Sequence, residues 1–117
     1  MKIAVNTRLL IKGKLDGIGW FSYETLKRIT QQRPNDEFIF IFDRAWDNSF
    51  IFNKNVTPVK AGPPSRHPFL WYLWFEQSIP KVLKKHQPDV FLSPDGYLSL
   101  NTAVPSLPVI HDLNFEH

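Results

Sequence analysis

The chain of 117 residues contains no cysteine. This absence excludes a disulfide framework, a zinc site with cysteine ligands and a thiol nucleophile, and it agrees with a reducing compartment such as the cytoplasm. Nor does any window reach the roughly 18 consecutive apolar residues that span a bilayer. The opening residues, 1–5, run directly into a strand-like pattern and lack the charged and apolar regions of a signal peptide. We therefore expect a cytoplasmic protein.

Dense positive charge is also missing. Lysine and arginine number 14 and acidic residues 11, so the formal net charge is only +3. Nucleic-acid-binding domains usually carry a denser basic stripe, so we expect no nucleic-acid partner. The weakly basic balance leaves a peripheral contact with an anionic lipid surface open. The four histidines show no metal-ligand spacing, and we expect neither a metal ion nor a cofactor.

Aromatic residues, by contrast, are plentiful. They make up 15% of the chain, with ten phenylalanines and four tryptophans. The shares of 43% apolar and 21% charged residues are typical of one small globular domain. A domain of this size buries only part of so many rings. We expect the surplus, above all in residues 69–75, to face a partner domain, a membrane surface or a lipid-linked acceptor.

The order of the apolar segments predicts an α/β fold. Short apolar runs predict strands at residues 2–6, 37–43, 56–60, 89–93 and 109–111. The run at 37–43 is continuous, as in a parallel-sheet strand that is buried on both faces. Helical patterns at residues 20–32 and 68–86 lie between the strands. This alternation predicts right-handed crossovers and a Rossmann-like, doubly wound parallel sheet.

Helical periodicity predicts which side of each helix is buried. In the first helix, the apolar residues that share one face with Ser22 and Thr25 are Ile18, Phe21, Leu26 and Ile29, while Trp20 lies opposite. In the second helix, the predicted buried face consists of Tyr72, Phe75, Ile79, Val82 and Leu83, while Trp74 points elsewhere. Pro80 would kink this helix unless it consists of two shorter pieces.

The first candidate site is Gly17, Ile18 and Gly19, in a loop between the first strand and the first helix. Glycine lets backbone N–H groups approach a ligand, and a helix N-terminus favours an anion such as phosphate. Arg8 adds positive charge in the same loop. The dinucleotide fingerprint requires a third glycine where the sequence has Ser22, so an NAD(P) site is not expected. The alternative is a flexible loop whose glycines only start the helix.

Further candidates follow the last two predicted strands. His111 and Asp112 follow the last one, and Asp95 and Tyr97 follow the one before it. The carboxyl ends of strands in an open α/β sheet face the ligand crevice. His111 could donate a hydrogen bond to a ligand hydroxyl, with Asp112 orienting it, and Asp95 could accept from such a hydroxyl. The alternatives are a structural histidine and an aspartate that only stabilises its Asp-Gly turn.

Several segments, taken in order, resemble one known family. They are residues 1–6 (Met-Lys-Ile-Ala-Val-Asn), 16–19 (Asp-Gly-Ile-Gly), 75–83 (with Glu-Gln-x-x-Pro), 88–94 (Pro-Asp-Val-Phe-Leu-Ser-Pro) and 108–113 (Pro-Val-Ile-His-Asp-Leu). As an ordered set they resemble the N-terminal domain of family 4 glycosyltransferases, which are retaining enzymes with the two-domain GT-B fold. The mannosyltransferase-like branch is the most similar, and the resemblance covers most of the chain.

The resemblance implies transfer of a hexose, with mannose as the first candidate, from a nucleotide diphosphate sugar to a glycan or lipid-linked acceptor. Cell-envelope polysaccharide synthesis uses such reactions. Residues 1–117 would then form part of the acceptor-side domain. A C-terminal domain that this chain lacks would hold most of the nucleotide, so we expect the chain to be inactive alone.

The resemblance also implies roles for single residues. Gly17, Ile18 and Gly19 would approach the donor diphosphate. His111 would project near the transferred sugar, and Asp112 would support its loop. Members of the family typically need no metal ion. The residues that we further expect to contact the acceptor are Arg8, Trp20, Asp95 and Tyr97.

Other classes of protein stay open. One is a non-catalytic, flavodoxin-like or receiver-like binding module that acts through its aromatic surface. A receiver has an acidic pair after its first strand, where this sequence has only Asn6. Another is a nucleotide-sugar epimerase-like or mutase-like Rossmann protein, against which the missing third glycine counts.

Overall fold

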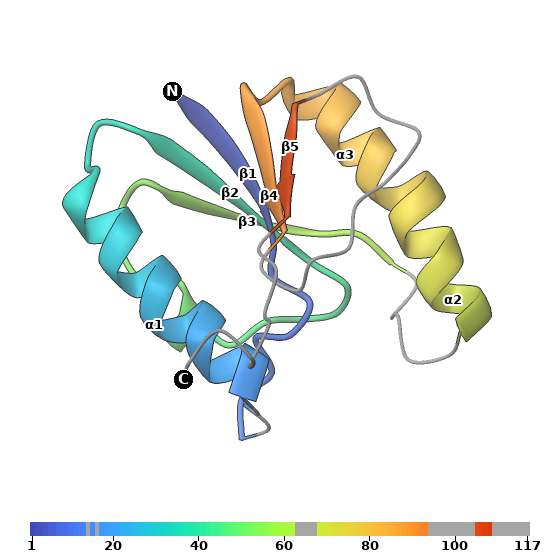
Figure 1. Cartoon of the computed structure of the whole chain (residues 1–117), viewed down its shortest axis with the longest axis horizontal. Helices are drawn as coiled ribbons and strands as arrows, with labels where there is room; N and C mark the ends of the chain where they lie inside the picture. Colours follow the sequence, from blue (N-terminus) through green and yellow to red (C-terminus); the bar gives the residue numbers. More distant parts are fainter. Residues whose placement is uncertain (14, 16, 63–67, 94–104, 109–117) are drawn as a thin grey trace, which may run out of the picture.

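The computed structural model describes residues 1–13, 15, 17–62, 68–93 and 105–108. Within them, five strands form one sheet in the order β3-β2-β1-β4-β5 (Figure 1). Their bounds are Lys2–Asn6 for β1, Glu37–Phe42 for β2, Val56–Lys60 for β3, Val90–Ser93 for β4 and Ser106–Pro108 for β5. Every pairing in this sheet is parallel, which confirms the predicted α/β class with a parallel sheet.

Helices cover both faces of the sheet (Figure 1). The helix α1, Gly17–Gln32, lies on one face together with a short 3₁₀ turn, η1, at Asn48–Phe50. On the other face a continuous helical segment runs through α2 (Pro68–Leu73), the π-helical turn η2 (Trp74–Ser78) and α3 (Ile79–His86). Each face of the sheet therefore has its own apolar cluster.

The strand β2 contributes to both clusters. Phe38, Phe40 and Phe42 pack in the cluster beneath α1, and Ile39 and Ile41 pack in the cluster beneath η2 and α3. All of these side chains are at most 1% exposed. Successive side chains of a strand point to opposite faces of the sheet. A continuous apolar run is therefore what β2 needs, and the prediction that it is buried on both faces is confirmed.

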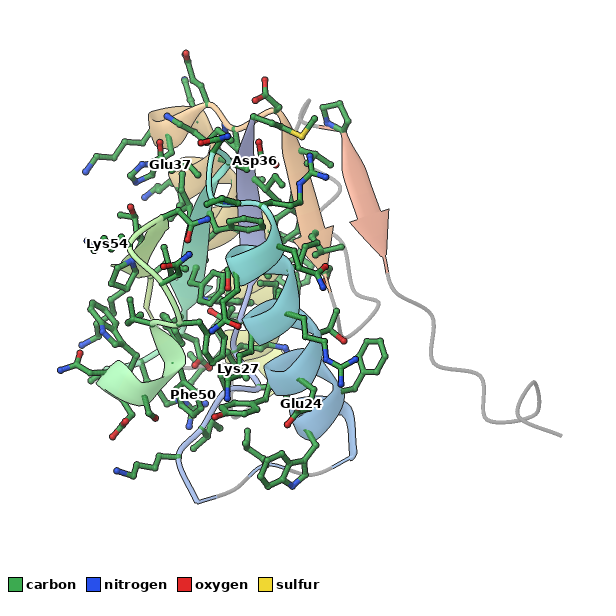
Figure 2. All side chains as sticks on the ribbon, turned by 90° about the vertical axis from the view of Figure 1, so that its left-hand side faces the viewer. Glu24, Lys27, Asp36, Glu37, Phe50 and Lys54 are labelled. Atoms are coloured by element: carbon green, nitrogen blue, oxygen red, sulfur yellow. The ribbon has the colours of Figure 1, made fainter. Side chains whose placement is uncertain are left out.

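One side-chain amide joins the end of α1 to the start of β3. Asn55 Nδ2 donates to the backbone oxygens of Thr30, Arg33 and Asp36 at 3.1, 3.0 and 2.9 Å. Carbonyls at the end of a helix have no partner within the helix, so Asn55 supplies one from outside. Figure 2 looks onto this side of the molecule, with Asp36 and Glu37 at the amino edge of the sheet.

The helix α1 is longer than predicted, and only part of its predicted buried face is buried. It begins at Gly17 rather than at residue 20. The residues at its centre of contact with the sheet are Ser22, Leu26 and Thr30, each at most 3% exposed, whereas Phe21 is 42% exposed. The prediction for Phe21 was wrong because small polar residues hold most of the central contact positions, and a hydrophobic pattern does not count them.

The second helical segment also differs from the prediction. Tyr72 is 56% exposed, whereas Trp74 is fully buried and its Nε1 donates to the Ala61 oxygen at 2.6 Å. The cause is η2, because a π-helical turn contains about one residue more than an α-helical turn and rotates the preceding residues by about 100°. Ile79 and Leu83 follow this turn and are buried as predicted.

Pro80 lies in the first turn of α3, directly after the π-helical turn. Ile79 N donates to the Trp74 oxygen, five residues back, so the α-helical hydrogen-bond ladder is already interrupted where proline lacks its donor. The segment therefore contains two α-helical pieces, which is the arrangement that Pro80 allows. The fifth strand lies at Ser106–Pro108, ahead of its predicted place, and residues 109–111 are outside the described residues.

Candidate functional site

The carboxyl edge of the sheet gathers short polar side chains. The strand order changes direction at β1, because β2 and β3 lie on one side of it and β4 and β5 on the other. In open α/β sheets ligands bind at such a point, outside the carboxyl ends of the strands. Asn6 ends β1 and Ser93 ends β4. Both are buried, and Asn6 Nδ2 donates to Ser93 Oγ at 3.2 Å.

Hydrogen bonds fix the chain where it leaves β1. Thr7 donates from its backbone N–H and from its Oγ1 to the Ile41 oxygen, at 3.0 and 2.9 Å. Arg8 N donates to Asn6 Oδ1 at 3.1 Å. The Arg8 guanidinium lies over the ring of Phe75, 5.7 Å from the ring centre, where the negative face of the ring attracts a cation. Positive charge is thus held at this edge.

A second guanidinium follows β2. Asp43 is 1% exposed, and Arg44 Nε and Nη2 donate to its two carboxylate oxygens, both at 2.8 Å. Hydrogen bonding to Asp43 raises the pKa of Arg44 above its ordinary value. This paired geometry fixes the position and orientation of the guanidinium.

The helix α1 starts at the same edge, because it follows β1 through one connection. Gly17, Ile18 and Gly19 lie in its first turn and not in a preceding loop, which corrects the prediction. The first N–H groups of a helix have no partner within it and form the positive end of the helix dipole. A Cβ added to Gly17 would meet nothing within 4 Å. Packing therefore does not require glycine there, whereas close approach of a ligand would.

Ser22 lies one turn further along α1 and is 3% exposed. In the part of the chain that the structure describes, its Oγ has no hydrogen-bond partner. Burying such a group without a partner costs about 1–3 kcal/mol. Helical side chains tilt toward the N-terminus of their helix. Ser22 therefore leans toward the first turn of α1, and a ligand oxygen bound there is a suitable partner for its hydroxyl.

The structure brings together part of the predicted site. The predicted residues that lie at the carboxyl edge are Arg8, Gly17, Ile18 and Gly19. Trp20 also lies in the first turn of α1, where it is 53% exposed and meets the Tyr23 ring edge-on at 5.7 Å. The predicted residues that lie outside the described residues are Asp95, Tyr97, His111 and Asp112.

Sequence reasoning missed Asn6, Asp43 and Ser93 as residues of this edge. Each of them stands at or just after the end of an apolar strand, and this position is the signal that could have found them. The hydrogen bond between Asn6 and Ser93 was beyond reach, because the two are 87 residues apart and meet only through the order of the strands. Ser22 was assigned to the buried side of its helix but not to a site.

The described residues contain no group of three or more His, Cys, Asp or Glu that could hold a metal ion. None of the helices among them is long and apolar enough to cross a bilayer. They do expose large aromatic rings, at Trp20, Phe21, Phe69 and Tyr72. No protein-family model, curated protein or solved structure matches the chain, so any assignment of function rests on its own residues and geometry.

Proposed function

We propose that the chain is the N-terminal, acceptor-side part of a retaining glycosyltransferase of the GT-B type, similar to family 4. The complete enzyme would transfer a hexose from a nucleotide diphosphate sugar to a glycan or lipid-linked acceptor in the cytoplasm. The ordered sequence motifs support this proposal. The strand order β3-β2-β1-β4-β5, with helices on both faces, supports a Rossmann-like reading of the sheet.

The observation that carries the proposal is the first turn of α1 at the point where the strand order reverses. Gly17 presents its backbone N–H group there without a bulky side chain, and none of the described residues in this turn is acidic. Negative charge grows on the diphosphate as the sugar leaves. Preorganised N–H groups and a helix dipole stabilise that charge without reorganising during the reaction.

Nearby groups have supporting roles in this proposal. Ser22 Oγ would donate a hydrogen bond to a ligand oxygen, and Arg8 would add positive charge near the acceptor. Trp20 would contact the acceptor through its exposed ring. His111 and Asp112, known here only from the sequence, would lie near the transferred sugar. Neither a metal ion nor a cofactor enters the mechanism, and most of the nucleotide would bind a domain that follows this chain.

A thermal-shift comparison tests whether the nucleotide binds mainly to this chain or to the domain that follows it. UDP, GDP and their sugars are added to this chain and, in parallel, to the product of its complete gene. Stabilisation of the complete product alone is expected, and the responding base would identify the donor. Strong stabilisation of this chain alone would place the nucleotide site here and contradict the expected role of that domain. A complete product without a second domain and without any shift would overturn the proposal.

Gly17→Ala separates binding from stability. The added methyl group meets no atom within 4 Å, and no positive φ angle is found at this position. Replacing glycine by alanine at such a site stabilises a protein by about 0.4–1 kcal/mol. We expect a slightly more stable protein whose complete form binds the donor at least tenfold more weakly. Unchanged donor affinity would remove the first turn of α1 from the site.

The alternative is a non-catalytic, flavodoxin-like binding module. The specific observation in its favour is that both helical layers expose aromatic rings, Trp20 on α1 and Tyr72 on α2. It predicts that no nucleotide sugar shifts the melting of either protein, whereas replacing these rings abolishes binding to a partner.

A further inference from the structure

A small pocket lies at the carboxyl edge of the sheet, between the connections that follow β1 and β2. Residues 10–12 of the connection after β1 and residues 44–47 after β2 line a hollow of about 290 Å³. Pockets that bind small molecules range over about 300–1,000 Å³. This one lies at the lower end of that range, so it suits a single ring and not a whole nucleotide.

The aromatic wall of the pocket is held in place from behind. Trp46 stacks on Phe42, with ring centres 5.5 Å apart and planes inclined by 28°. Phe42 is itself 1% exposed in the core, so the indole cannot move far. Trp46 is half-buried, and its remaining surface lines the pocket. A π face of this kind attracts groups with partial positive charge, such as the C–H groups on one side of a sugar ring.

Charged groups in the pocket occur in pairs of opposite sign. Arg44 is held by the buried Asp43, and Lys12 Nζ lies 3.2 Å from an Asp47 oxygen. Hydrogen bonds from Ser49 and then from Lys12 lower the pKa of Asp47 to about 2, so this carboxylate accepts hydrogen bonds at all ordinary pH values. The pocket therefore offers both donors and acceptors, with almost no net charge.

We propose that this pocket binds one pyranose ring of a saccharide. Sugar hydroxyls both donate and accept, and here they meet two cationic donors and a carboxylate acceptor. A phosphate would meet the Asp47 carboxylate, and a cation would meet Arg44 and Lys12. A lipid chain would leave those charges without solvent. A neutral ring with hydroxyls around its rim and C–H groups on one face avoids all of these costs.

The assignment of this sugar as part of the acceptor rests on the proposed glycosyltransferase function. Binding of a sugar ring does not, because it follows from the pocket alone. The pocket uses none of the residues that the sequence suggested for the acceptor. The pocket and the first turn of α1 lie at the same edge of the sheet, so an acceptor bound in the pocket would share that edge with a donor diphosphate on the turn.

Saturation-transfer NMR on this chain tests the pocket. The probes are the methyl glycosides of mannose, glucose and galactose at about 50 mM, above the millimolar dissociation constants expected for single sugars. Glycerol is the control for hydroxyls without a ring. We expect transfer to ring C–H protons of at least one glycoside and none to glycerol. No transfer to any glycoside, or equal transfer to glycerol, would overturn the proposal.

Matched variants locate the binding. Ala45 is exposed and lines the pocket, so Ala45→Leu fills the hollow without removing a core contact. It should raise the dissociation constant at least tenfold, as should Trp46→Ala if circular dichroism finds it folded. Tyr72→Ala removes a more exposed aromatic ring that lies outside the pocket, and it should leave binding unchanged. Wild-type binding by Ala45→Leu, or loss of binding in Tyr72→Ala, contradicts the assignment.

The two proposals fail separately. If glycosides bind here and no nucleotide shifts the complete product, the sugar pocket stands and the enzyme proposal fails. If nucleotides bind the complete product and glycosides do not bind this pocket, the reverse holds. In an active complete enzyme, Ala45→Leu should raise the acceptor KM at least tenfold and leave the donor KM unchanged. An unchanged acceptor KM would show that the pocket is not the acceptor site.

Discussion

Replacing Ser22 by alanine should make the ligand-free protein more stable. The Ser22 side chain is 3% exposed, and its Oγ has no partner in the described part of the chain. Alanine keeps the Cβ, removes the unpaired hydroxyl and opens only a very small space. Two effects act in the same direction. Loss of the buried, unpaired hydroxyl contributes about 1 kcal/mol or more, and the higher helix propensity of alanine contributes about 0.5 kcal/mol.

The expected gain is therefore about 1.5 kcal/mol. With a urea m-value of about 1.5 kcal/mol per molar for a small domain, the unfolding midpoint should rise by about 1 M. Thr25→Ala is the matched control, because Thr25 is exposed in the next turn of α1 and reports helix propensity without a buried hydroxyl. It should raise stability by about 0.5 kcal/mol. The difference between the two variants isolates the cost of the unpaired hydroxyl.

The same substitution should weaken ligand binding in the complete protein. A tenfold loss of affinity would reduce the stabilisation given by a ligand present at 100 times its original dissociation constant from about 2.7 to about 1.4 kcal/mol. If Ser22→Ala is no more stable than Thr25→Ala, or is less stable than the unsubstituted protein, then the hydroxyl is already satisfied. The reasoning that connects Ser22 to a ligand would then be refuted.

Three further predictions concern the fold. Asn55→Ala should lower the free energy of unfolding by about 2 kcal/mol, because several carbonyls at and after the end of α1 lose their donor. Asn55→Asp should cost more, because a carboxylate donates no hydrogen bond. Urea unfolding measures both variants. Trp74→Phe should cost about 2 kcal/mol in the same assay, since it removes a hydrogen bond and leaves a small cavity. Hydrogen bonds from Ser49 and then Lys12 lower the pKa of Asp47 to about 2, below its unfolded value of about 3.9. The resulting stabilisation should be complete above pH 4 and disappear as the pH falls toward 2, and unfolding measured against pH should become flatter there in Asp47→Asn.

The sheet could be predicted from the sequence because its signal is local. Residues 38–42 are apolar at every position, and the structure buries both faces of this run under separate helical layers. Glycine and proline clusters mark the connections between such runs. Strand boundaries differ by a few residues, most of all at β5, which includes Pro108 instead of beginning after it. The edge strand β5 is short and has little apolar pattern of its own, so its first and last residues are set by its pairing with β4.

The sides of the helices were harder to predict because their causes are not in the apolar pattern. Because of one π-helical turn, Tyr72 is exposed and Trp74 is buried, the reverse of the prediction, and no residue in that turn indicates it in the sequence. In α1, the polar residues Ser22 and Thr30 occupy buried contact positions, and of these only Ser22 was assigned to the predicted buried face. Thr30 Oγ1 donates to the Leu26 oxygen at 2.8 Å and is satisfied. Ser22 lacks such a partner, so burial of its hydroxyl costs free energy that burial of the Thr30 hydroxyl does not.

The candidate site was likewise predicted only where its signal is local in the sequence. The sequence placed Gly17 and Gly19 at the carboxyl edge, because the connection from a strand to the next helix leaves no other position for them. It did not reveal the contact of Asn6 with Ser93 or the pocket beside Trp46, because both join segments that meet only in three dimensions. Residues 44–55 gave no clear secondary-structure pattern, and that ambiguity hid the pocket wall.

Two positions at the start of α1 are occupied by residues that stability alone would not select. Alanine fits at position 17 without a contact, and alanine at position 22 would remove a buried hydroxyl that has no partner in the described residues. Natural sequences agree with their fold at most positions and depart from it mainly where function requires it. The two departures are about 1.4 turns apart, near the positive end of a helix dipole at the edge where the strand order reverses. In the proposed enzyme, a diphosphate on this turn would account for both departures, because it would need a bare backbone at position 17 and would accept a hydrogen bond from Ser22.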